Sequence, residues 1–264
     1  GYSIPLQVYS DYHQQKLIKE ILFKFNIDKK YLHTIHSHIS HAKNSGDPVG
    51  YFDKQPRVSF MRLSEVYGIY EKELREKNAV DFDNILLQTR NLLRDCPDIR
   101  KQYHLLFDYV LVDEYQDTND LQEEITRLLL GNGNIFCVGD DWQAIYGFRG
   151  SNISHFLRFT SHYKNSKVFR LEQNYRSTEE IVQAANELIR YNSQQMGKAC
   201  YSIKKGGTIQ VHSFFNDEEE ADWVAEKILS LSRQKIAYDK MAVLYRTKFC
   251  SLSFEKSFRA SRIP

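Results

Sequence analysis

From residue 97 onward the chain alternates short apolar runs with amphipathic helical stretches, and this pattern restricts the fold more than any other feature. Short apolar runs of this kind are typical of strands that are buried on both faces of a parallel sheet, with helices carrying the chain back between them. The pattern therefore predicts an α/β fold with parallel sheets flanked by helices. The runs that qualify as strands are 107–112, 134–139, 168–172, 208–214 and 241–246.

The first 79 residues have a different, mostly helical pattern. Apolar residues recur at three- and four-residue spacing in the stretches 11–25 and 59–78, where Phe60 is one of them, and again in a stretch that opens at Asp81. Each of these stretches is predicted to be a helix. The polar stretch 191–207 is predicted to be a loop.

Composition excludes several classes of protein and chooses none. A length of 264 residues suits about two domains, and 36 basic against 34 acidic residues give a net charge of +2, which argues for no particular partner. The four cysteines form no CxxC pair, so neither a disulfide framework nor a zinc site is indicated. The absence of an apolar run of about 20 residues and of a signal-peptide profile predicts a cytoplasmic protein without a membrane partner.

Carboxylates follow directly after the run 107–112, in the sequence LVDEYQD. Ligands of open α/β sheets bind beyond the carboxyl ends of the strands, so Asp113, Glu114, Gln116 and Asp117 stand where a ligand would be held. In a protein that cleaves phosphate esters, the first Asp would hold Mg²⁺ through water and the adjacent Glu would orient or deprotonate the attacking water. An acidic turn that leads into a helix explains the bare pair equally well.

The next predicted strand also ends in carboxylates, within VGDDWQAIYGFRGS. Asp140 and Asp141 would join Asp113 and Glu114 at one edge of the sheet, where the four charges would repel one another unless a cation or hydrogen-bond donors lay among them. A metal-bound phosphate would supply such a cation. The pair of acidic strand ends therefore favours a phosphate site over an acidic turn.

Aromatic and basic residues follow these carboxylates. Tyr146, Phe148 and Arg149 form a group suited to stacking on single-stranded bases and contacting phosphate, although each ring could instead belong to the core. Tyr175 and Arg176 precede a predicted helix; the Arg could stabilise charge on a transferred phosphoryl group, and the Tyr could stack on a nucleobase. The alternative for Arg176 is a plain surface residue.

DEYQDTN, VGDDWQAIYGFRGS and LEQNYRS, in this order, resemble the second, third and fourth motifs of superfamily 1 DNA helicases of the UvrD/Rep/PcrA type. DFDNILL, DEEEADWVAEKI and AVLYRTKFCSLSFEKSFRASRIP resemble further segments of that family, so the similarity covers essentially the whole chain. The resemblance implies RecA-like P-loop NTPase lobes with an inserted helical accessory domain. It assigns residues 1–79 to the accessory domain, 80–167 to the C-terminal part of the first lobe and 168–264 to the N-terminal part of the second.

The resemblance also implies a role for each matching residue. The catalytic residues would be Glu114 as the base, Gln143 as the sensor of the γ-phosphate and Arg176 as an arginine finger. The cofactor-binding residues would be Asp113 as the Mg²⁺ ligand, Tyr175 stacked on adenine, and Gln116 and Asp117 coupling the nucleotide state to the lobes. Tyr146, Phe148 and Arg149 would grip single-stranded DNA.

The phosphate-binding loop GxxxxGK[ST] is absent from the chain, because the only Gly-Lys pair, Gly197-Lys198, is followed by Ala199. We therefore expect a fragment of an ATP-dependent 3′→5′ helicase that does not hydrolyse ATP by itself. The family implies ATP and Mg²⁺ as cofactors, single-stranded DNA and duplex junctions as partners, and repair or replication proteins as candidates. The alternatives are a naturally truncated, non-catalytic DNA-binding or interaction module, or the helicase part of a helicase–nuclease.

Overall fold

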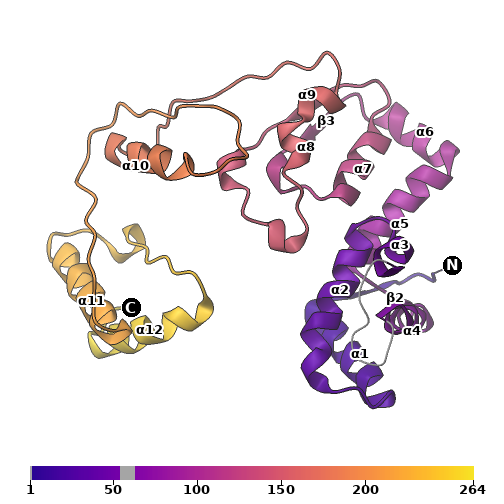
Figure 1. Cartoon of the computed structure of the whole chain (residues 1–264), viewed down its shortest axis with the longest axis horizontal. Coiled ribbons are helices and arrows are strands. Elements are labelled where there is room, and N and C mark those ends of the chain that lie inside the picture. Colours follow the sequence, from indigo (N-terminus) through magenta and orange to yellow (C-terminus); the bar gives the residue numbers. More distant parts are fainter. Residues whose placement is uncertain (1, 54–62) are drawn as a thin grey trace. The chain divides into compact units, whose positions relative to one another are not determined.

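The computed structural model describes residues 2–53 and 63–264 and divides the chain into two compact units (Figure 1). The first unit contains Gly1–Glu172 and Ala185–Cys200, and the second contains Gln173–Ala184 and Tyr201–Pro264. The chain therefore passes from one unit to the other after Glu172, after Ala184 and after Cys200.

Helices dominate both units. Those of the first unit are α1 (Asp11–Lys24), α2 (Leu32–Asn44), α3 (Pro48–Asp53), α4 (Leu63–Glu76), α5 (Phe82–Asp95), α6 (Pro97–Leu106), α7 (Asp120–Leu129), α8 (Ser154–Leu157) and α9 (Phe159–His162). The boundary between the units falls inside α10 (Glu179–Ile189), and the second unit continues with α11 (Asp217–Arg233) and α12 (Ser251–Ala260). Among the described residues, no helix combines the length and the apolar character needed to cross a lipid bilayer.

The helices expected near the N-terminus are confirmed. The stretch 11–25 forms α1, and the stretch that opens at Asp81 forms α5, with the Asp81 side chain accepting a hydrogen bond of 2.7 Å from the Asn84 backbone N–H as its N-cap. The helix expected over 59–78 is α4, whereas Phe60 and the rest of its expected first turn lie outside the described residues.

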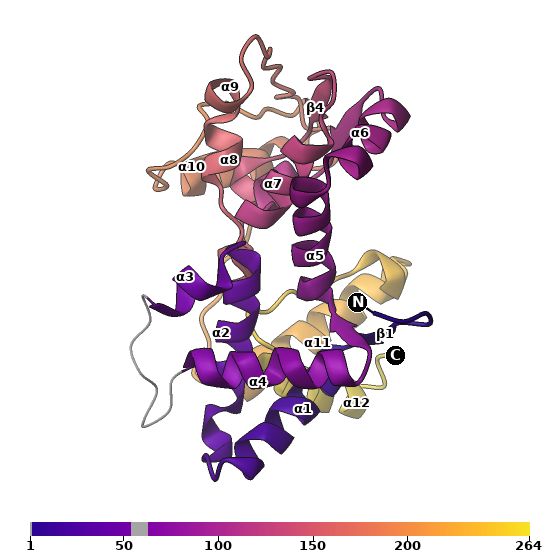
Figure 2. The ribbon, with the colours of Figure 1, turned by 90° about the vertical axis from the view of Figure 1, so that its right-hand side faces the viewer.

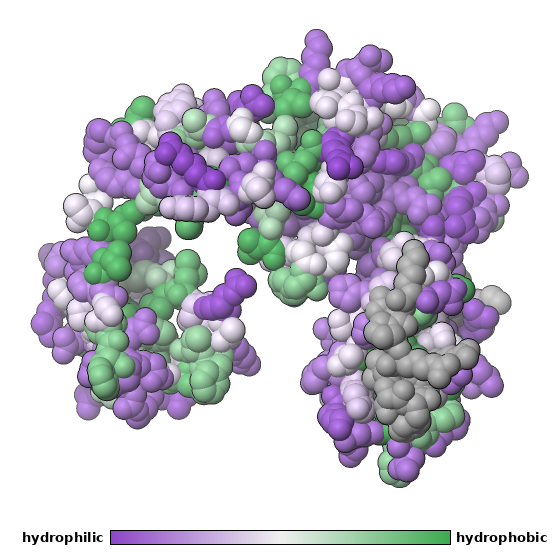
Figure 3. Space-filling view, in the orientation of Figure 1, coloured by the Kyte–Doolittle hydropathy of each residue, from purple (hydrophilic) through white to green (hydrophobic). Residues whose placement is uncertain are grey.

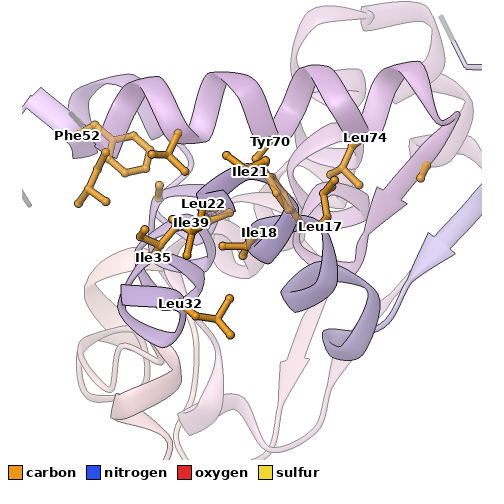
Figure 4. Close-up of a cluster of buried hydrophobic side chains, with 14 residues drawn as sticks. Leu17, Ile18, Ile21, Leu22, Leu32, Ile35, Ile39, Phe52, Tyr70 and Leu74 are labelled. Carbon is orange, nitrogen blue, oxygen red and sulfur yellow. The ribbon is translucent and has the colours of Figure 1, made fainter. Parts of the chain in front are cut away.

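The main hydrophobic core lies between α1, α2 and α4, which pack against one another (Figures 2 and 4). Each helix presents one apolar stripe to the core, as the three- and four-residue spacing requires. The buried side chains labelled in Figure 4 are Leu17, Ile18, Ile21, Leu22, Leu32, Ile35, Ile39, Phe52, Tyr70 and Leu74.

A buried lysine joins this core to α5. The Lys43 side chain is fully buried, and its Nζ lies 2.5 Å from Asp81 Oδ2 and 2.7 Å from Glu71 Oε1. The Tyr70 hydroxyl donates a hydrogen bond of 2.9 Å to the same Asp81 oxygen. Because a charge this deep is tolerated only when it is paired and hydrogen-bonded, the contacts hold the start of α5 against α2 and α4.

Both sheets are small and parallel. Strand β1 (Gln7–Tyr9) pairs with β2 (Ala79–Asp81), and β3 (Val110–Val112) pairs with β4 (Ile135–Cys137). The runs 107–112 and 134–139 are thus confirmed as strands in their central residues. The β1–β2 pair was not predicted, because neither segment has the length or the alternation of a recognisable strand.

The strands predicted at 168–172, 208–214 and 241–246 are wrong for this structure, which places these runs outside any strand. A parallel strand needs a second segment with a matching row of N–H and C=O groups, and the described residues offer these runs no such ladder. Their apolar side chains lie exposed instead: Leu171, Val211 and Leu244 are each more than 90% accessible, and apolar surface is visible over the C-terminal part of the chain (Figure 3). The structure therefore has the helices and parallel strands of the predicted α/β class, but it is rich in helix and its parallel sheets are small.

Candidate active site

Strands β3 and β4 end side by side, and polar residues follow both ends. Val112 is in register with Cys137, and the ladder continues beyond them because the Tyr115 N–H donates to the Val138 carbonyl at 2.9 Å. The chain then turns through Asp113 and Glu114 on one side and through Asp140 on the other. The structure thus brings the two acidic strand ends to one edge, as their position after parallel strands predicts.

Gln116 links the two strand ends. Its side chain is almost fully buried, and its Oε1 accepts a hydrogen bond of 2.9 Å from the Asp140 N–H. Its Nε2 donates to Glu114 Oε2 at 2.8 Å and to Asp117 Oδ2 at 3.3 Å. Gly139 permits this close approach, because a Cβ there would lie 2.5 Å from Gln116 Oε1. One buried amide therefore fixes the position of Glu114 relative to β4.

Asp113 and Glu114 are exposed to solvent. Glu114 has a left-handed backbone with φ 48°, a conformation that costs a non-glycine residue on the order of 1–3 kcal/mol and gathers at functional sites. Asp113 Oδ1 accepts the Glu114 N–H at 2.9 Å, and its other oxygen accepts no hydrogen bond from the described residues. An exposed carboxylate with a free oxygen is a ligand type that suits Mg²⁺.

The Asp117 side chain is more buried than those of Asp113 and Glu114. Burial, followed by the charge of Glu114, raises the pKa of this carboxyl above its usual value. Its Oδ1 is buried and has no hydrogen-bond partner among the residues that the structure describes. Buried polar atoms are nearly always paired, so an unpaired oxygen at this edge fits a residue that gains a partner when a ligand binds.

The cation beside the second acidic pair is a lysine rather than a metal. Lys198 Nζ forms an ion pair with Asp140 Oδ1 and lies 2.8 Å from Asp141 Oδ1, and it stands over the Trp142 ring at 4.6 Å from the centroid. The Asp141 side chain is 1% exposed, and its other oxygen accepts the Met196 N–H at 2.6 Å. Lys198 therefore provides Asp140 and Asp141 with the counter-charge that we expected from a metal-bound phosphate.

The pKa values of these groups follow from the contacts. Burial alone would lower the pKa of Lys198, but its hydrogen bonds to Asp140 and Asp141 outweigh burial and raise it. Burial would likewise raise the pKa of Asp140, whereas hydrogen bonds from Lys198 and Gln143 bring it below the usual value. The Gln143 bond, from Nε2 to Asp140 Oδ2, is 2.8 Å long, so Gln143 belongs to the same network.

Lys198 is the residue at this site that sequence reasoning missed. The Gly197-Lys198 pair does not match a phosphate-binding loop, so no motif in the sequence points to this lysine. A usable signal was nonetheless present, since two adjacent carboxylates that follow a strand need a counter-charge. The sequence contains no indication that the counter-charge comes from a segment 57 residues beyond Asp141.

Tyr146, Phe148 and Arg149 gather beyond this network. The two rings lie 6.0 Å apart, and the Arg149 guanidinium carbon stands 5.3 Å from the Tyr146 centroid and 5.6 Å from that of Phe148. Phe148 is 71% exposed, so these rings are not core residues of this structure. The group forms an exposed platform of aromatic faces and one cation.

Tyr175 and Arg176 belong to the second unit. Tyr175 is 76% exposed, and its hydroxyl donates to Gln173 Oε1 at 2.9 Å. Asn174 Oδ1 accepts the N–H groups of Arg176 and Ser177 at 3.0 and 2.8 Å, which shapes the turn before α10. The Arg176 side chain is exposed and makes no ion pair within the described part of the chain. Both side chains are therefore accessible to a ligand.

Comparison with known proteins matches most of the chain to two domains of one helicase family. Residues 2–164 match the UvrD/REP helicase N-terminal domain, and residues 169–264 match the UvrD-like helicase C-terminal domain. The chain is 36% identical over 256 residues to the ATP-dependent DNA helicase PcrA of Staphylococcus epidermidis and 37% identical over 257 residues to that of Leuconostoc citreum. Each match covers 95% of this chain.

The chain spans about a third of the length of these relatives, 35% for the staphylococcal protein and 34% for the Leuconostoc protein. The family match nevertheless extends over both units described above. The chain belongs to the UvrD/REP helicase family.

Proposed function

We propose that this chain is part of an ATP-dependent 3′→5′ DNA helicase that couples Mg-ATP hydrolysis to movement along single-stranded DNA. The observation that carries the proposal is the hydrogen-bonded edge of β3 and β4, where Gln116 joins Glu114 to Asp140 and Asp140 joins Gln143. Through this network Glu114, which would lie next to the attacking water, and Gln143, which would lie next to the γ-phosphate, would move together.

The residues of this edge suit a phosphate-cleaving site. Asp113 would hold Mg²⁺ through water, and Glu114 would accept the proton of the attacking water. When bound, Mg²⁺ neutralises charge on the phosphoryl oxygens. Arg176 would stabilise that charge further and Tyr175 would stack on adenine, while Gln116 and Asp117 would transmit the nucleotide state. In this proposal the rest of the phosphate cradle would come from residues outside this chain, because the chain has no GxxxxGK[ST] loop.

The proposal includes a domain assignment and a setting. Residues 1–79 would form the accessory domain inserted in the first RecA-like lobe, 80–167 the C-terminal part of that lobe, and 168–264 the N-terminal part of the second. Duplex junctions would be the DNA substrate, repair or replication proteins the candidate partners, and the cytoplasm the compartment.

The proposal predicts different activities for the chain and for the full-length polypeptide that contains it. The full-length polypeptide should hydrolyse Mg-ATP faster when single-stranded DNA is added, whereas the 264-residue chain should show no measurable turnover because it lacks the phosphate loop. Steady-state phosphate release with and without DNA measures both. Turnover by the chain alone would contradict its inactivity. No turnover by the full-length polypeptide would favour a non-catalytic DNA-binding module.

The aromatic platform predicts a defect confined to DNA binding. In the full-length polypeptide, Phe148→Ala should weaken binding to single-stranded DNA by about 1–3 kcal/mol, roughly 5–150-fold, because the lost ring removes one stacking surface. Fluorescence anisotropy with a labelled oligonucleotide, without nucleotide, measures the change. Phe23→Ala is the matched control, since Phe23 is 83% exposed on α1 and lies outside the platform. Equal affinities for the two variants would remove Phe148 from the DNA site.

A further inference from the structure

A second group of polar side chains lies outside the site described above, where α7, α8 and α9 adjoin (Figures 1 and 2). Each helix contributes one side chain to it: Glu123 from α7, His155 from α8 and His162 from α9. Each side chain offers one potential ligand atom, and these three atoms lie within 4.8 Å of one another. None of the three takes part in the nucleotide or DNA roles proposed above.

His155 has the hydrogen-bond pattern of a metal-binding imidazole. Its Nε2 lies 2.8 Å from Asp120 Oδ1, which also accepts a hydrogen bond of 2.8 Å from Asn152 Nδ2. Because an ionised carboxylate only accepts, Nε2 is the donor in this contact, and in the corresponding neutral tautomer Nδ1 has the lone pair. That Nδ1 is buried and has no hydrogen-bond partner within the described residues. Histidines that bind metals in proteins are typically held in this way by a carboxylate.

Glu123 is fixed as a buried anion. It is 2% exposed, its Oε1 accepts bonds from Arg127 Nε at 2.8 Å and Tyr163 OH at 3.0 Å, and its Oε2 accepts one from Tyr115 OH at 2.5 Å. A carboxylate has about four lone-pair positions, so Oε2 retains one for another ligand. The three donors orient the carboxylate without using its last position.

His162 completes the group from the solvent side. Its ring centroid lies 5.9 Å from that of His155, and its side chain is exposed, so an ion could enter past it. An imidazole ligates a metal through the lone pair of an unprotonated nitrogen, and His162 offers such an atom to the group.

We propose that Glu123, His155 and His162 bind a divalent transition-metal ion of the zinc type, with solvent as the fourth ligand. Two imidazoles and one carboxylate match the preference of Zn²⁺, whereas Mg²⁺ and Ca²⁺ prefer oxygen ligands alone. The ion would tie α8 and α9 to α7, and it would give the unpaired His155 Nδ1 its partner. This proposal does not depend on the helicase activity.

Metal titration of the full-length polypeptide, after treatment with a chelator, tests the proposal. Co²⁺ is the spectroscopic probe and Zn²⁺ the competitor. We expect visible absorption from Co²⁺ at one site, its loss on addition of Zn²⁺, and its absence in His162→Ala. His33→Ala should behave as the parent, because His33 is exposed on α2 and far from this group in sequence. An identical Co²⁺ spectrum in His162→Ala and the parent would overturn the proposal, as would no spectral change in the parent.

Two further measurements separate metal binding from a structural role of the histidines. Asp120→Asn leaves all three ligands in place but removes the carboxylate behind His155, so Co²⁺ affinity should fall by about 10–100-fold. In the unmodified protein, Zn²⁺ should protect His162 from diethyl pyrocarbonate, with the modified residue located by mass spectrometry. Unchanged modification of His162 in the presence of Zn²⁺ would exclude it as a ligand without any variant that has to fold.

Discussion

Glu114→Gln should lower the DNA-stimulated ATP hydrolysis of the full-length polypeptide by about 10²–10⁴-fold, the range lost when a positioned general base is removed. The substitution changes the chemistry and keeps the shape, because the new amide oxygen can still accept the hydrogen bond of 2.8 Å that Gln116 Nε2 donates to Glu114. A neutral amide cannot take the proton of the attacking water. Single-turnover phosphate release at saturating ATP measures the loss.

DNA affinity is the internal control for this variant. Binding to single-stranded DNA should stay within about twofold of the parent, because nothing in the Tyr146–Arg149 platform changes. Glu65→Gln, an exposed residue of α4, is the matched substitution and should leave hydrolysis unchanged. If Glu114→Gln retains hydrolysis comparable to Glu65→Gln, another group acts as the base.

Lys198→Met should destabilise the folded protein by about 3–5 kcal/mol, the usual cost of removing one partner from a buried ion pair. Lys198 is 14% exposed and Asp141 only 1%, so the substitution leaves the buried Asp141 charge with the Met196 N–H as its donor and without its cation. Asp140, at 35% exposed, keeps more of its hydration and contributes less to the loss. Urea denaturation at pH 7, followed by circular dichroism, measures the change, and Lys16→Met on the exposed face of α1 is its control.

The stability lost in Lys198→Met should also depend on pH, in a direction that follows from the pKa of Asp140. The folded-state pKa of Asp140 lies below the usual value of 3.8, so its ionic contacts stabilise the protein above that pH, and this stability is lost as the pH falls through the lower folded-state pKa. Without Lys198 the share of this contribution that comes from the lysine is missing at every pH, whereas the hydrogen bond from Gln143 remains. The difference in unfolding free energy between the parent and Lys198→Met should therefore stay level from pH 7 to about 4 and shrink as the pH falls further. A difference that stays constant would assign the loss to packing against Trp142.

The features that the sequence predicts well in this chain are those that depend on residues close together in the sequence. The helices α1 and α5 follow from periodic apolar residues, and β3 and β4 follow from apolar runs that end in polar turns. The placement of Glu114 and Asp140 at one edge needs only one further rule, that parallel strands end on the same side of a sheet.

What could not be predicted depends on distant parts of the chain. Leu171, Val211 and Leu244 lie in short apolar runs typical of buried strands, but a strand also requires a partner, and such a run does not supply one. Lys198 reaches Asp141 across 57 residues, and its local sequence is that of an ordinary polar loop. The unpaired nitrogen of His155 is similarly invisible in sequence, because it depends on which side chains surround the ring.

The passage of the chain after Glu172, Ala184 and Cys200 limits how this molecule can be dissected. Cleavage at any single peptide bond would leave at least one of the two units incomplete. Truncation after Glu172, which looks like a natural boundary, would remove Ala185–Cys200 and with it the cation of Asp140 and Asp141. A fragment that contains the whole first unit and none of the second therefore requires a circular permutation or a graft of the 185–200 segment onto residues 1–172.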